Sequence, residues 1–104
     1  MSPFSVDPVA ARQIDEVYDY SRRHWGAEQA ERYVHGMFEH FGAISEQRVI
    51  WRAIPAAFGI AGFYSRYERH YVYWKRHSDH GIAIFAVLHV RMQQAVRLRR
   101  TAGD

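Results

Sequence analysis

The sequence predicts an α+β domain in which a helical hairpin packs on a mainly antiparallel, curved sheet. Two segments of the first half carry apolar residues at helical spacing, one over residues 8–25 and one that follows and runs to residue 44. The second half is rich in aromatic residues and holds three segments that suit strands. With one short strand before the helices, the predicted order is β-α-α-β-β-β, in two layers.

Residues 4–8 predict the first strand and the start of the first helix. Phe4-Ser5-Val6 alternates apolar and polar residues and predicts a short strand. Asp7 suits the start of a helix because its carboxylate can accept from free backbone N–H groups, and Pro8 suits the first helical position. We expect this helix to end at Gly26 in the left-handed conformation. A joint of one or two residues then predicts that the second helix runs back antiparallel to the first.

Two glycines lie inside the second helix, Gly36 and Gly42. Each costs about 1 kcal/mol relative to Ala, so we expect both to allow close packing against the neighbouring helix or the sheet. Residues 45–60 contain Pro55 and Gly59, which interrupt regular secondary structure. We interpret this segment as an irregular connection that covers part of the core.

The remaining chain is predicted to form strands and one short helix. Residues 62–68 suit a strand, and residues 69–76 favour one strongly because aromatic residues are dense there. Residues 77–81 indicate a hairpin loop with Gly at its end. Residues 82–88 are apolar without alternation, which is typical of a central strand buried on both faces. Residues 90–100 include four Arg and suit a short basic helix.

Composition narrows the class of protein. The chain has 104 residues, no linker and no repeat, so we expect residues 1–104 to form one domain. It has no cysteine, which excludes disulfides and thiolate metal sites. No apolar run approaches the roughly 20 residues that cross a bilayer, and Met1-Ser2-Pro3-Phe4 lacks the pattern of a signal peptide. We therefore expect a cytoplasmic protein without membrane contact.

Charge is distributed unevenly along the chain. Residues 1–46 hold four Arg and eight acids, a net charge of −4, whereas residues 47–104 hold ten Lys or Arg and three acids, a net charge of +7. Such a basic half attracts acidic partners, which could be a protein segment or a nucleic acid. The alternative is a solvated basic surface without a partner.

Seven His residues raise the question of a metal site. His77 and His80 are three apart with Asp79 between them, and His35 and His40 are five apart, so the latter pair diverges around a helix. No two His have the four-residue spacing that places both imidazoles on one helical face. We expect neither a metal nor another cofactor.

A metal-free ribonuclease needs a base, an acid and cations that stabilise charge on the phosphate. The predicted strands offer His70, His89, Arg66 and Lys75 for these roles. Such residues are common in a basic, aromatic half-domain, and His89 could instead cap the end of the buried strand by hydrogen bonding. Catalysis by these residues is therefore an alternative hypothesis, and no catalytic residue is expected.

Three stretches together resemble one family. Trp25-Gly26-x-x-Gln29-Ala30-x-x-Tyr33 lies at the helix joint, residues 66–73 are similar to the family's penultimate strand, and His89-Val90-Arg91-Met92 is similar to its ending. Each stretch is weak alone, but their order and spacing over residues 4–98 resemble the ParE-like branch of the RelE/ParE superfamily of type II toxins. Gln93 departs from the pattern, in which Asp is frequent.

The resemblance implies a β-α-α-β-β-β toxin fold and neutralisation by a ParD-like antitoxin. It also implies that the protein is a non-enzymatic inhibitor of DNA gyrase. We expect contact with the target or antitoxin through cations that pair with acids or phosphates and through an adaptable Met. These residues are Arg66, Arg69, Arg91, Met92 and Arg97. The alternatives are a ribosome-dependent mRNA endonuclease of the RelE kind and an inactive relative that only binds its partner.

Overall fold

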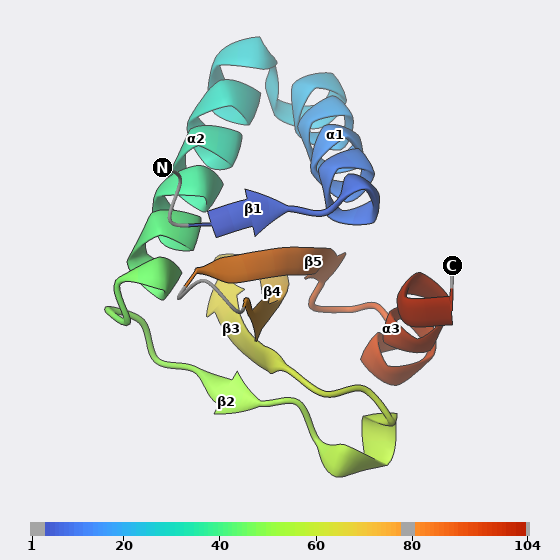
Figure 1. Ribbon diagram of the computed structural model, residues 1–104. Helices are drawn as coiled ribbons and strands as arrows, with labels where there is room; N and C mark the ends of the chain where they lie inside the picture. The colour runs from blue at the N-terminus through green and yellow to red at the C-terminus, as the bar shows by residue number, and fades with distance from the viewer. Residues whose placement is uncertain (1–3, 78–80, 104) are drawn as a thin grey trace.

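The computed structural model describes residues 4–77 and 81–103, with side chains up to residue 101. Helices α1 and α2 cover one face of a five-stranded sheet, and α3 lies at its other face (Figure 1). In chain order the elements are β1 (Phe4–Val6), α1 (Pro8–Trp25), α2 (Ala27–Ser45), β2 (Arg52–Ala53), the 3-10 helix η1 (Ala56–Phe58), β3 (Phe63–Tyr67), β4 (His70–Arg76), β5 (Ile82–His89) and α3 (Gln94–Gly103).

The strands are ordered β1-β5-β4-β3-β2 across the sheet. β1 runs parallel to β5, and every other pair is antiparallel. The predicted α+β class and its mainly antiparallel sheet are thereby confirmed. The segment 45–60 differs from the prediction, because it contains a further edge strand, β2, in which Arg52 pairs with Tyr64. Two residues are too few for an alternating pattern to show in the sequence.

The helical hairpin forms as predicted, although its ends differ in detail (Figure 1). α1 begins at Pro8, but the Asp7 side chain makes no capping hydrogen bond. The backbone N–H of Asp7 instead donates to the carbonyl of Ile84, at 2.9 Å, and ties the helix start to β5. Gly26 alone separates the helices, with φ 93° and ψ 162°. Its φ is positive, but its extended ψ is not the predicted left-handed helical conformation.

The core has one cluster on each face of the sheet. Between the hairpin and the sheet lie Ala10, Ile14, Met37, Phe41, Ile44, Val72, Trp74, Ile82, Ile84 and Val87. On the other face, the cluster beneath α3 and η1 consists of Ile54, Tyr73, Phe85, Ala86, Leu88 and Leu98, the last of which α3 contributes. β5 contributes side chains to both clusters and is buried from Ile82 to Leu88, which confirms the prediction of a strand buried on both faces.

A β-bulge bends the sheet between β4 and β5. Tyr73 pairs with Ala86, but Trp74 pairs with Ile84, so Phe85 is an extra residue. As a result, the consecutive residues Phe85 and Ala86 both face the cluster under α3. An extra residue of this kind increases the local twist and kinks the strand, which accounts for curvature at this point.

The two glycines of α2 differ in their surroundings. A Cβ atom at Gly36 would overlap the hydroxyl of Tyr67, so close packing against the sheet explains this glycine. A Cβ atom at Gly42 would meet nothing within 4 Å. The packing explanation predicted for Gly42 is therefore wrong.

Short connections join β3 to β4 and β4 to β5. β3 and β4 are joined by the turn Glu68–Arg69, in which Glu68 has a positive φ of 51°. The predicted hairpin loop at residues 77–81, with its His77, Asp79 and His80, lies partly outside the described residues, which omit 78–80.

In the described part of the chain, no helix has the length and apolar character to cross a membrane.

Candidate partner-binding surface

Four of the five predicted contact residues gather at one end of the sheet, where the β3–β4 turn meets the connection from β5 to α3. His70 at the start of β4 pairs with His89 at the end of β5. The backbone N–H of Val90 then donates to the carbonyl of Arg69, at 2.9 Å, and holds the two connections together. We call this region the turn surface, and it consists of Arg66, Arg69, Arg91 and Met92.

The turn surface adjoins the tip of the helical hairpin. The guanidinium carbon of Arg69 lies 5.9 Å from the centre of the Trp25 ring, which is within the range of a cation–π contact. Trp25 is 60% exposed. Nε of Arg66 donates to the backbone carbonyl of Glu68, at 2.7 Å, and this bond orients the side chain beside the turn.

The turn surface is positively charged. The guanidinium groups of Arg66, Arg69 and Arg91 are exposed, and none of them forms an ion pair with a described residue, since the ion pairs found involve Arg32, His35 and Arg48. Glu68 supplies an acid in the same turn. Three unpaired guanidinium groups favour a carboxylate-rich or phosphate-bearing partner, and the exposed Met92 adds an apolar contact that adapts to shape.

Tyr33 and His70 form a partly buried hydrogen bond beneath the turn. The Tyr33 hydroxyl lies 2.7 Å from Nδ1 of His70 and accepts the backbone N–H of Arg69, at 3.2 Å. Its own proton is therefore available to His70. Burial, together with the nearby charges of His89 and Arg69, lowers the pKa of His70 from 6.5 to about 4. His70 is thus neutral at pH 7, and through Tyr33 it supports the backbone of the turn at Arg69.

His89 and Gln94 fix the connection after β5. Nδ1 of His89 accepts the backbone N–H of Arg91, at 3.1 Å, so His89 does hydrogen bond at the strand end. The Gln94 amide donates to the carbonyls of His89 and Met92, both at 2.8 Å, and its oxygen accepts the hydroxyl of Tyr73, at 2.7 Å. Sequence reasoning missed Gln94, because one amide at the first residue of a helix carries no distinctive pattern.

The residues considered for a ribonuclease do not all converge. The rings of His70 and His89 are 5.3 Å apart, but Lys75 lies at the opposite end of β4. Its Nζ is 5.1 Å from the centre of the Phe85 ring, on the sheet face away from His70. Arg66 pairs with Tyr71 and also faces away from His70, because neighbouring strand residues alternate between faces.

Two further predictions concern sites elsewhere. Arg97, the fifth predicted contact residue, is exposed on α3 beside the buried Leu98 and is not part of the turn surface. Within residues 4–77 and 81–103, no group of three or more His, Asp or Glu could hold a metal ion.

Comparison with known protein families decides the identity. The family model described as the ParE toxin of the type II toxin-antitoxin system parDE matches residues 4–94. The chain belongs to the ParE toxin family. It is therefore the toxin of a type II toxin–antitoxin system, as the resemblance implied. The match includes the hairpin, all five strands and the turn surface of this ParE-family toxin, and it ends before Arg97. No curated protein matches the chain.

Proposed function

We propose that this ParE-family toxin inhibits DNA gyrase by binding it through the turn surface, without catalysing a reaction. The observation that supports this most is the set of three exposed guanidinium groups that form no ion pair with a described residue, together with the exposed Met92. Such a surface suits a macromolecular partner with acidic side chains or phosphates. Cytoplasmic residence belongs to the same proposal, because gyrase acts on chromosomal DNA.

A supercoiling assay with purified gyrase tests the target. We expect the toxin to inhibit supercoiling, and the double variant Arg69→Gln/Arg91→Gln to need about tenfold more protein, since each guanidinium makes charge-assisted hydrogen bonds. The control Arg12→Gln/Lys75→Gln removes the same two charges from exposed positions outside the turn surface and should inhibit like the parent. Unchanged supercoiling at a large excess of the parent toxin refutes the proposal.

A ribosome-dependent mRNA endonuclease is the competing function, and the facing rings of His70 and His89 are the observation in its favour. Two observations oppose it: His70 is 9% exposed, and Nδ1 of His89 already accepts a backbone N–H. Primer extension on translated messages separates the two functions. Cuts that His89→Ala abolishes would assign catalysis to this pair, whereas uncut messages support the non-enzymatic toxin.

We further propose that a ParD-like antitoxin with an acidic segment neutralises the toxin. The second half of the chain, with its net charge of +7, supports an acidic partner. Co-expression with the product of the adjacent reading frame should restore growth of cells that make the toxin. If expression of the toxin alone leaves growth unaffected, the result supports the alternative that the protein is an inactive relative that only binds its partner.

A further inference from the structure

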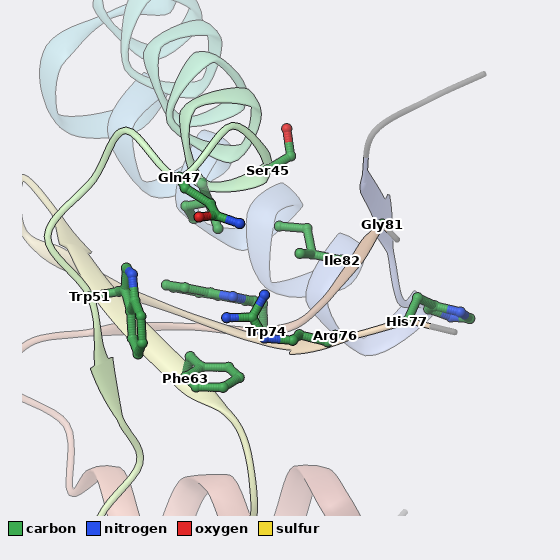
Figure 2. Close-up of a pocket in the computed structure, with 10 residues that line it drawn as sticks. Ser45, Gln47, Trp51, Phe63, Trp74, Arg76, His77, Gly81 and Ile82 are labelled. Atoms are coloured by element: carbon green, nitrogen blue, oxygen red, sulfur yellow. The ribbon is translucent and has the colours of Figure 1, made fainter. Parts of the chain in front are cut away.

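A hollow lies at the other end of the sheet, away from the turn surface. The residues that line it come from the end of α2, the segment that follows α2, and the strands β3, β4 and β5 (Figure 2). The hollow measures about 300 Å³, and its lining includes Gln47, Trp51, Phe63, Trp74 and Arg76. That volume accommodates one or two fused rings with a small substituent.

Aromatic rings form the walls of this hollow. The Trp51 and Phe63 rings are 5.1 Å apart and nearly perpendicular, at 87°, and the Phe63 and Trp74 rings are 6.1 Å apart at 30°. Trp74 is buried, but Trp51 remains 44% exposed at the rim. Flat aromatic surfaces around an open space bury a planar ring by stacking or edge contact.

The hollow offers a guanidinium group and an indole N–H as donors. Arg76 stacks its guanidinium 5.0 Å from the centre of the Phe63 ring and forms no ion pair with a described residue. The Trp74 indole N–H has no acceptor among the described residues, and because no buried side-chain nitrogen there lacks a partner, it must reach open space. None of the described lining residues is an acid. The hollow therefore matches an anionic ligand.

Gln47 provides an independent observation. It has a φ of 60°, and its N–H donates to Ile44 while that of Arg48 donates to Ala43, both at 2.9 Å. This pair of bonds is the Schellman end of a helix, where glycine is the favoured residue. A glutamine there strains the backbone, yet it places an amide that Figure 2 shows turned toward the space shared by Trp74 and Arg76.

We propose that this hollow binds a small planar anion, namely an aromatic ring joined to a carboxylate or phosphate group. The ring lies against Trp51, Phe63 and Trp74, the Arg76 guanidinium pairs with the anionic group, and the Gln47 amide contacts other polar atoms of the ligand. This site is separate from the turn surface and does not depend on the proposed action on gyrase.

Tryptophan fluorescence of the Trp25→Phe variant tests the proposal, because Trp51 and Trp74, the two remaining tryptophans, both line the hollow. The probes are adenosine 5′-monophosphate, N-acetyl-L-phenylalanine and uncharged adenosine. We expect saturable quenching by at least one of the two anions and none by adenosine. Binding of adenosine 5′-monophosphate alone would identify phosphate as the anionic group of the ligand, and binding of N-acetyl-L-phenylalanine alone would identify carboxylate. No saturable change up to about 10 mM of either anion overturns the proposal.

Two variants make the test specific. Arg76→Gln should weaken binding about tenfold, whereas Lys75→Gln removes the same charge from the adjacent residue on the opposite sheet face and should leave binding unchanged. Equal weakening by both variants contradicts the site. Gln47→Gly should weaken binding while raising Tm, because it relieves backbone strain. Weaker binding accompanied by a lower Tm would mean that Gln47 acts only on the fold.

Discussion

Two glycines of one helix differ in what surrounds them. Gly36 packs on Tyr67, whose hydroxyl donates to the carbonyl of Tyr33, at 3.0 Å, while Gly42 faces open space. We expect Gly36→Ala to lower the free energy of unfolding by about 1 to 3 kcal/mol through overpacking. Gly42→Ala, its control, should raise it by about 0.5 to 1 kcal/mol, because Ala has the higher helix propensity. Urea unfolding measures both, and equal changes would contradict the packing at Gly36.

The buried His70 makes stability depend on pH. Its pKa is about 4 in the folded protein against 6.5 in the unfolded chain, so the unfolded state binds more protons between these values. Stability is therefore complete above pH 6.5 and falls as the pH drops toward 4, by on the order of 3 kcal/mol. His40, whose pKa burial also lowers, contributes in the same direction.

Urea midpoints measured from pH 7 to pH 4 check this dependence. His70→Gln should remove most of the fall, because an amide does not titrate in this range. His35→Gln changes an exposed histidine of α2 and should retain the fall. A slope that survives in His70→Gln would assign the acid sensitivity to other groups.

At the scale of elements, α3 depends on one fully buried side chain. Leu98 is 0% exposed and belongs to the cluster on the outer face of the sheet, whereas Val96 on the same helix is 37% exposed. We expect Leu98→Ala to cost about 2 to 5 kcal/mol of stability and Val96→Ala less than about 1 kcal/mol. Thermal unfolding of the two variants tests this, and similar Tm values would show that α3 is not docked through Leu98.

The long elements were predictable from the sequence, and the short ones were not. Apolar spacing identified α1 and α2, and an unbroken apolar run identified β5, because many residues repeat one signal there. β2 has only two residues, and the turn at Glu68 uses a residue type that rarely adopts a positive φ. The register shift at Phe85 is likewise invisible, since its cause is packing between strands.

The turn surface was partly predictable because the resemblance and the excess of Arg singled out its residues. Their proximity depends on the pairing of His70 with His89, which the sequence does not specify. The contact between Tyr33 and His70 joins residues 37 positions apart, and no local pattern indicates it. The aromatic hollow was missed for the same reason, since it needs the path of residues 46–51 as well as the strand register.

At the scale of the whole molecule, the sheet joins the two halves of the chain. β1 pairs with β5, and the radius of gyration of 13.4 Å is close to the value of about 13 Å for a compact domain of 100 residues. We expect residues 1–104 to unfold in one transition, with equal calorimetric and van't Hoff enthalpies. Two resolved transitions would show that the hairpin and the sheet are separate cooperative units.

The pairing of β1 with β5 also has a consequence during synthesis. Ile82, Ala83 and Ile84 are the residues that pair with β1, and 81 residues are synthesised before the first of them. Until then α1 and α2 lack the inner strand on which they pack, and the histidine pair that supports the arginines is incomplete. A nascent copy that stalls before Ile82 therefore lacks the strand that completes the sheet, the core cluster under the hairpin and the pairing beneath the turn surface.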